Sequence, residues 1–219
     1  MGFYFEKINN KKVLKSDLLK NIMHCFTTRE ISIEESLKYF GSKKNIFPTQ
    51  THSDHVEIVD NRIEYPETDS LILTQKDISI YLKFADCTPI IFYDTEKNIG
   101  AIAHAGWRGT VKKIGIKTLE KMNSNPSKII AVIGPAIGKC CYEVSEEVKK
   151  ELLSTVKNKS NLFYNRQVDL KMINARQLEE FGVNQIDICP YCTSCNNDLF
   201  YSYRKENGTE KRHHALLKL

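Results

Sequence analysis

The sequence has 219 residues, of which 41% are hydrophobic and 27% charged, and its net charge is +5. These values are typical of one globular domain, residues 1–219, that buries its core without disulfide staples. The basic residues are scattered rather than gathered in a stripe, which disfavours nucleic-acid binding and leaves a modest attraction for anionic small ligands.

The sequence shows no apolar run of the kind expected for a secretory signal or a membrane span. We therefore expect a cytoplasmic protein without a membrane partner, either a monomer or a weak homodimer. In that compartment the seven cysteines stay reduced, and they favour metal or catalytic roles over disulfides.

The spacing of apolar residues predicts alternating clusters of strands and helices. In chain order these are a helix over 31–40; strands over 56–59, 71–73, 78–84, 89–93 and 99–104; a helix over 109–122; a strand over 129–133; helices over 145–156 and 171–181; and strands over 186–188 and 200–203. Ser32 and Glu35 form a capping-box pattern at the first helix, and Gly182 ends the last one. The order predicts an α+β fold, a single domain with a mixed β-sheet flanked by helices.

Three polar residues lie where predicted apolar strands begin or end: His52 before one strand, Cys87 between two, and His104 at the end of another. Two imidazoles and a thiolate suit Zn²⁺, and three protein ligands leave a fourth tetrahedral position for water or substrate. The spacing alone is not diagnostic, because a buried cysteine and two hydrogen-bonded core histidines would give the same pattern. Asp86 and His55 are neighbouring polar residues that could support the ligands.

The tetrapeptide Gly-Trp-Arg-Gly at 106–109 follows His104 directly. Arg108 would then lie near a helix N-terminus, where its guanidinium and the backbone N–H groups can hold a phosphate or carboxylate. A structural salt bridge is an equal alternative for Arg108.

Two groups of cysteines are left over. Cys189, Cys192 and Cys195 form a C-x2-C-x2-C run that superficially resembles an iron–sulfur or zinc knuckle, but a fourth nearby cysteine is missing. We therefore favour a role without metal for this run. Cys140 and Cys141 are interpreted as core packing, because adjacent cysteines rarely form a comfortable disulfide.

Five short segments follow one another in a distinctive order. They are TQTHS at 49–53, ADCTP at 85–89, AHAGWRG at 103–109, IGPAIG at 133–138 with CCYEV at 140–144, and SYR at 202–204. In sequence and order they resemble the laccase-domain family, whose members are named multicopper polyphenol oxidase, purine nucleoside phosphorylase or peptidoglycan editing factor. The sequence departs from the family pattern after Arg29, where Glu30 and Ile31 replace a pair of glycines.

The resemblance implies that His52, Cys87 and His104 are zinc ligands, with copper as the alternative ion. It implies a mixed sheet flanked by helices, similar to the fold of the cytotoxic-necrotizing-factor deamidases. It also implies phosphorolysis of adenosine, inosine, guanosine and methylthioadenosine, and deamination of adenosine. One such metal set does not resemble a multicopper centre, which needs many more histidines than the six present.

On this interpretation the partners are a small-molecule nucleoside and phosphate, and metal-bound water or phosphate is the nucleophile. Asp86 is the candidate proton shuttle, and Arg29, Gln50 and Arg108 are the candidate substrate-binding residues.

Two alternatives remain open. The first is an amide hydrolase that edits a peptidoglycan precursor, with either zinc hydroxide or a Cys87/His104 dyad as the attacking group. The second is a binding module stabilised by a structural zinc ion, which would need a fourth protein ligand.

Overall fold

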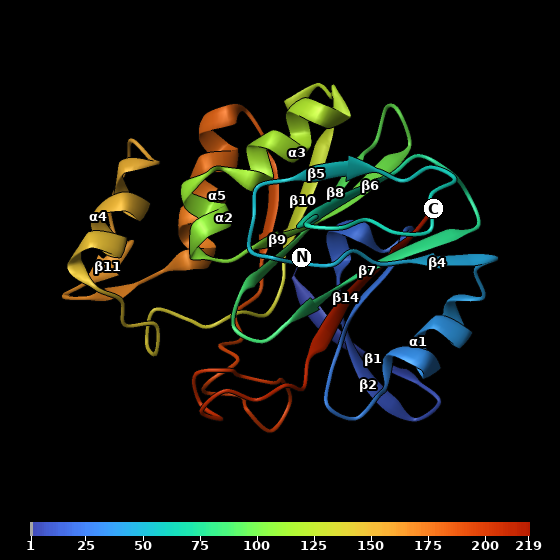
Figure 1. Cartoon of the computed structure of the whole chain (residues 1–219), viewed down its shortest axis with the longest axis horizontal. Helices are drawn as coiled ribbons and strands as arrows, with labels where there is room; N and C mark the ends of the chain where they lie inside the picture. Colours follow the sequence, from blue (N-terminus) through green and yellow to red (C-terminus); the bar gives the residue numbers. More distant parts are fainter. Residues whose placement is uncertain (1) are drawn as a thin grey trace.

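Two six-stranded sheets form the centre of the protein, which we describe from a computed structural model covering residues 2–219 (Figure 1). The first sheet has the order β1 (Phe3–Ile8), β2 (Lys11–Ser16), β3 (Met23–Thr27), β14 (His213–Lys218), β7 (Ile78–Phe84) and β4 (Lys44–Ile46). The second sheet has the order β13 (Gln185–Ile188), β10 (Ile129–Ile133), β8 (Thr88–Asp94), β9 (Ile99–Ala105), β6 (Ser70–Leu73) and β5 (Val56–Ile58). Each sheet is mixed, because β4 pairs in parallel with β7, β5 with β6, and β10 with β13, whereas the other pairs are antiparallel.

Alternation of side chains along the strands lets the two sheets share one core. In β14, Ala215 and Leu217 face the core between the sheets, whereas Leu216 faces the opposite side of the first sheet. In β8, Ile91 faces the shared core and Ile90 faces away from it. Both faces of both sheets therefore bury apolar side chains, which requires a helical layer on each outer face.

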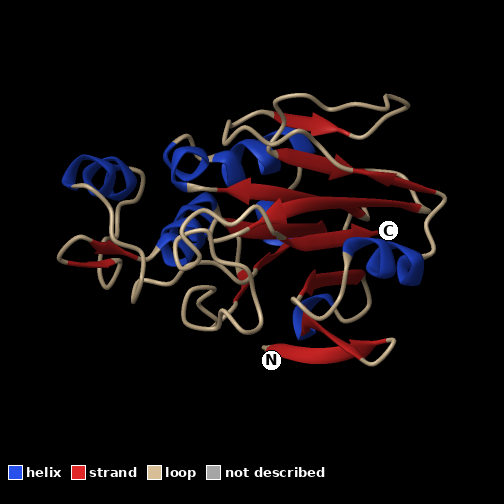
Figure 2. Ribbon diagram, turned by 60° about the horizontal axis from the view of Figure 1, so that its bottom comes forward, coloured by secondary structure: helices blue, strands red, loops and turns tan. Residues whose placement is uncertain are grey.

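Helices supply these outer layers (Figure 2). On the first sheet, Phe40 of α1 (Ile33–Phe40) packs in one cluster with Leu216. On the second sheet, Leu119 of α3 (Ile114–Met122) and Leu178 of α5 (Leu170–Phe181) pack in one cluster with Ile90. The remaining elements are α2 (Trp107–Val111), α4 (Glu146–Ser154), the hairpin of β11 (Phe163–Tyr164) and β12 (Gln167–Val168), and the 3-10 turns at Asp17–Leu19 and Pro126–Lys128. In Figure 1, α4 and β11 lie at the left end of the molecule, beside the sheets rather than upon them.

The predicted α+β class with mixed pairing is confirmed, although the strands form two sheets rather than one. The capping box at α1 is also confirmed, since Ser32 accepts from the backbone of Glu35 and the Glu35 carboxylate accepts from the backbone of Ser32. Gly182 ends α5 in the left-handed conformation, as predicted. No helix within residues 2–219 combines the length and apolar character needed to cross a membrane.

The single helix predicted over 109–122 is wrong. The chain forms α2 and α3 instead, and Lys113 between them has a left-handed φ of 58°. The apolar spacing continues through the break, but the apolar residues before and after it pack in different core clusters. Val111 packs with the cluster beside α4, whereas Ile114 packs on the second sheet.

The strand predicted over 200–203 is also wrong. Phe200 is fully buried, but its N–H donates to the carbonyl of Asn196 at 3.0 Å. The N–H of Ser202 donates to the Glu206 carboxylate at 2.9 Å. These two backbone donors are thus used in local contacts rather than in a sheet. Conversely, β1 to β4, the β11–β12 hairpin and β14 were not predicted from the sequence pattern.

Candidate metal centre and its pocket

Three side chains far apart in the sequence meet where the chain crosses from the first sheet to the second. His52 lies in the loop before β5, Cys87 in the connection from β7 to β8, and His104 near the end of β9. One ligand atom from each residue, a ring nitrogen or the sulfur, lies within 4.8 Å of the other two. The structure therefore brings together the three residues that the sequence singled out.

The backbone around this cluster has an unusual conformation. His52 and Asp86, beside Cys87, both have left-handed φ values, 60° and 83°. Non-glycine residues in sparsely populated backbone regions cost about 1–3 kcal/mol and persist where the surroundings hold them. Gly106 leaves room for the cluster, because a Cβ atom there would lie 3.0 Å from the Cys87 sulfur and 3.1 Å from the His52 ring.

Asp69 anchors the cluster from behind. It is fully buried, and its carboxylate lies 2.7 Å from Nδ1 of His104. The same carboxylate accepts hydrogen bonds from the backbone N–H groups of Thr51, His52 and Ser53. Burial alone would raise the pKa of Asp69, but the hydrogen bonds from His104 and Ser53 lower it to about 2. Because Asp69 engages Nδ1, it fixes the His104 ring and leaves Nε2 for the cluster.

Cys87 and His104 favour each other's charged forms. Burial disfavours a charge on either group, but their mutual attraction prevails when no metal is bound. It lowers the pKa of Cys87 to about 6 and raises the pKa of His104 to about 9. The thiolate is the form of cysteine that both binds metals and attacks electrophiles, so the site is prepared for either chemistry.

The donor set fits one borderline-soft cation such as Zn²⁺. Within residues 2–219, no fourth His, Cys, Asp or Glu side chain joins this group. His55, a predicted supporting residue, instead pairs with Glu57 at 2.9 Å. A structural zinc site is closed by four protein ligands, whereas a catalytic one keeps a position open. These three side chains alone would leave one tetrahedral position of a bound ion open.

A pocket of about 610 Å³ opens above the cluster. Its volume is within the range of small-molecule sites, about 300–1,000 Å³. The cluster residues lie among its lining residues together with aromatic and basic side chains: Phe47, Tyr142 and Tyr203, and Lys83, Arg204 and Arg212. The pocket thus combines flat apolar surfaces with positive charge beside a prospective metal.

Residues 27–219 match the protein family described as multi-copper polyphenol oxidoreductase laccase. The chain belongs to this family. The resemblance that the five motifs indicated is thereby confirmed.

The curated relatives of this laccase-family chain include proteins with a nucleoside-related name. Purine nucleoside phosphorylase YlmD of Bacillus subtilis is 37% identical, over 76% of this chain and 68% of the relative. A purine nucleoside phosphorylase of Clostridium acetobutylicum is 33% identical, over 80% of this chain and 76% of its own length. YlmD of Staphylococcus aureus is 30% identical, over 85% and 76% of the two chains.

Two solved structures share the fold of this chain. A hypothetical protein of Bacillus licheniformis, YfiH, and YlmD from Geobacillus stearothermophilus each superpose with a TM-score of 0.87. Both are 26% identical to this chain, and each alignment covers 98% of both proteins. This chain therefore shares its overall architecture with these two proteins.

Two other predicted site residues, Asp86 and Gln50, line the pocket of this laccase-family protein. Both oxygens of the buried Asp86 carboxylate are engaged, one by the Thr193 hydroxyl at 2.6 Å and the other by the Arg204 N–H at 2.7 Å. The Gln50 amide forms two hydrogen bonds with the backbone of Lys83. Both residues thus position neighbouring segments of the pocket wall.

Arg29 and Arg108 are not among the residues that line the pocket. Arg29 forms an ion pair with Glu206, and its guanidinium lies 4.2 Å from the Tyr201 ring centre. Arg108 is exposed and lies over the ring of Trp107. Their predicted roles in substrate binding stay predictions.

Several residues in or behind the pocket could not be predicted from the sequence motifs. Asp69 belongs to none of the motifs, and only the fold places it behind His104. Lys83 and Arg212 are basic residues with no local signal that separates them from other surface cations. Arg204 could have been chosen, because it belongs to the SYR motif.

Proposed function

We propose that this chain is a zinc-dependent purine nucleoside phosphorylase that also deaminates adenosine. The observation that carries the proposal is the three-ligand cluster, open on one side, among the lining of a pocket with aromatic and basic walls. Curated relatives named purine nucleoside phosphorylase, 30–37% identical to the chain, supply the substrate class.

Zinc is preferred over a multicopper centre because of how the histidines are distributed. Of the six histidines, only His52 and His104 belong to a potential metal cluster within residues 2–219. His24 and His213 are buried elsewhere in the fold. A single copper ion in place of zinc would use the same ligands, but the described residues offer no second histidine-rich site for electron transfer among several coppers.

In phosphorolysis, different pocket residues bind the phosphate and the purine. Phosphate attacks C1′ of the ribose, the bond from C1′ to the purine nitrogen breaks, and the base leaves after gaining a proton. Lys83, Arg204 and Arg212 bind the phosphate as a positively charged group. Phe47 and Tyr203 offer flat apolar faces to the purine. A cation held by the cluster supplies Lewis acidity at the pocket.

For deamination, water replaces the amino group at C6 of adenine and ammonia leaves. Asp86 stays the candidate for moving the proton, with the constraint that both of its oxygens already accept hydrogen bonds. Gln50 stays the candidate for substrate binding at the pocket edge. Both assignments concern side chains that line the pocket.

The second candidate function is amide hydrolysis by a metal-free Cys87/His104 dyad. The observation in its favour is the charge distribution of the site, with the pKa of Cys87 lowered to about 6 and the pKa of His104 raised to about 9. A nucleophilic cysteine paired with a histidine needs these shifts.

Product analysis with and without phosphate separates these activities. We expect purified protein to release hypoxanthine from inosine only when phosphate is present, and to convert adenosine to inosine without phosphate. Removing the metal with a chelator should abolish both reactions, and adding Zn²⁺ should restore them. If neither nucleoside is turned over, and the protein instead hydrolyses a muramyl–amino-acid nucleotide after metal removal, the dyad is favoured. Cys87→Ala should then lose that hydrolysis.

Matched variants locate the activity in the cluster. His52→Ala and Cys87→Ala should each lose metal and at least about tenfold in activity. His55→Ala is the control, because this exposed histidine lies three residues from His52 but outside the cluster. Equal activity of His52→Ala and His55→Ala would refute the assignment.

A further inference from the structure

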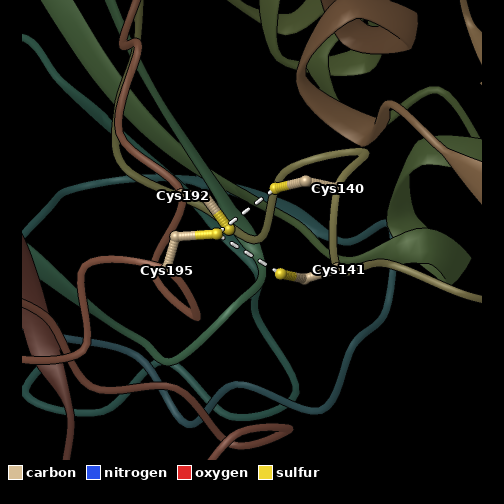
Figure 3. Close-up of side chains that lie close together, drawn as sticks. All are labelled: Cys140, Cys141, Cys192 and Cys195. Carbon is tan, nitrogen blue, oxygen red and sulfur yellow. Dashed lines mark hydrogen bonds between the residues drawn. The ribbon is translucent and has the colours of Figure 1, made fainter.

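Four cysteines converge at a second place, which the site described above does not use. Cys140 and Cys141, in the loop after β10, face Cys192 and Cys195, in the loop after β13 (Figure 3). The four sulfur atoms all lie within 4.8 Å of one another. The Cys195 sulfur is 3.5 Å from that of Cys140 and 3.4 Å from that of Cys141.

This convergence corrects both interpretations made from the sequence. Cys140 and Cys195 are exposed, so Cys140 does not serve as core packing. Cys141 is half-buried and packs at the edge of the core cluster beside α4, but its sulfur also belongs to this group. Of the C-x2-C-x2-C run, only Cys192 and Cys195 belong to the cluster, and Cys140 and Cys141 join them from about 50 residues upstream. Cys189 is buried in the core between the sheets and takes no part in the cluster.

We propose that Cys140, Cys141, Cys192 and Cys195 bind one Zn²⁺ ion, as a structural metal site separate from the pocket. Zn–S bonds of about 2.3 Å in a tetrahedron place the sulfurs about 3.8 Å apart. The observed spacing brackets this value, from 3.4 Å to at most 4.8 Å. Four thiolates close the coordination shell, as in structural zinc sites, and binding releases the four thiol protons to solvent.

The spacing disfavours the other uses of four cysteines. A disulfide joins sulfurs at about 2.05 Å, and all four cysteines are free. An iron–sulfur cluster with several irons binds its cysteines around the outside of a multi-atom core. Its sulfurs would therefore lie farther apart than those around one ion.

The surrounding backbone supports the cysteines. The Gly138 N–H donates to the Cys192 sulfur at 3.1 Å, which stabilises negative charge on that atom. A Cβ atom on Gly138 would lie 3.3 Å from the Cys140 sulfur, so a side chain here would crowd the cluster. The buried ammonium of Lys171 donates to the carbonyls of Cys189 and Tyr191 and holds the loop that leads to Cys192.

A metal here would fix one wall of the pocket. The loop that carries Cys140 and Cys141 also contributes Ile137 and Tyr142 to the pocket lining. The other loop contributes Thr193, whose hydroxyl holds the Asp86 carboxylate. Joining the two loops through one ion would therefore stabilise the pocket without touching its three-ligand cluster.

Metal counting tests the proposal without reference to activity. Chains produced in zinc-supplied cells and analysed by mass spectrometry for metals should contain one equivalent more zinc than the double variant C192S/C195S. Cys189→Ala is the matched control, because it removes a cysteine of the same run that lies outside the cluster, and it should keep the full zinc content. The variant His52→Ala should lose only the zinc of the pocket, so the zinc content of each site can be tested independently of the other.

A measurement on protein with the cysteine cluster intact covers the case in which C192S/C195S does not fold. Zinc-edge X-ray absorption on His52→Ala should show four sulfur neighbours at about 2.3 Å. Any one of three results would overturn the proposal. The first is equal zinc content in wild type and C192S/C195S, and the second is an absorption spectrum without sulfur neighbours of zinc. The third is an intact mass that reveals a disulfide among these cysteines.

Discussion

Asp69 offers the sharpest test of how the fold holds the candidate metal centre. The substitution Asp69→Asn keeps the size of the side chain but removes its charge and one of its two acceptor oxygens. The carboxylate receives the N–H groups of Thr51, His52 and Ser53, and it also holds Nδ1 of His104. An amide cannot accept all of these hydrogen bonds, and its own NH2 group would face donors.

The size of the effect follows from the pKa of Asp69, which is lowered from 3.8 to about 2. Folding therefore favours the charged form, and this contribution is present above pH 3.8 and lost as the pH falls through about 2. At about 1.4 kcal/mol per pKa unit, the charged carboxylate contributes about 2 kcal/mol. Donors left unsatisfied add about 1–3 kcal/mol. At neutral pH we expect Asp69→Asn to lose about 3–5 kcal/mol of unfolding free energy.

The assay combines urea unfolding of the metal-free protein with zinc titration of the folded protein. Loosening of His104 should weaken zinc binding at the pocket about 10- to 100-fold. Asp54→Asn is the control, because Asp54 lies in the same loop region but pairs with Lys112 and Lys117 at the surface. Such exposed pairs contribute about 1 kcal/mol or less. If Asp69→Asn matched Asp54→Asn in both stability and zinc affinity, the anchoring role assigned to Asp69 would be refuted.

Two further predictions concern a glycine and a buried histidine. Gly106→Ala should reduce zinc affinity about tenfold or more, because its Cβ would lie 3.0 Å from the Cys87 sulfur. Gly115→Ala is the control and should keep the zinc affinity of wild type, because its Cβ would lie 3.6 Å from its nearest neighbours. Equal zinc titrations of the two variants would contradict this steric argument. His24 is held neutral by burial, which lowers its pKa to about 4, while its Nε2 accepts from the Ser16 N–H. Its folded pKa lies below the unfolded value of 6.5, so its stabilising contribution is present above pH 6.5 and is lost as the pH falls toward 4. Between pH 6.5 and 4, acidification should lower the unfolding free energy of His24→Gln less than that of wild type, by about 1.4 kcal/mol per pH unit. The exposed His55→Gln should follow wild type. If urea unfolding gave the same pH slope for all three proteins, His24 would be excluded as a source of the pH dependence of stability.

Local chemistry in the sequence determined a good part of the fold. The capping box of Ser32 and Glu35 places the start of α1 to within about two residues, because both hydrogen bonds form within a single helical turn. The β-branched and apolar runs from Ile78 to Ala105 predict β7, β8 and β9, because strand side chains need only their own alternation to define two buried faces. The positions of Cys87 and His104 at the ends of these strands follow from the same runs.

Only the tertiary structure decided which distant groups meet. The sequence gives no local sign that Asp69 lies behind His104, or that Cys140 and Cys141 join Cys192 and Cys195. These contacts depend on how the two sheets pack and on where their connecting loops end. Strand periodicity states which face of a strand is buried, but it does not state the partner that buries it. Spatial convergence is a property of the packed sheets, and for this protein it produces both an open three-ligand group and a closed group of four cysteines.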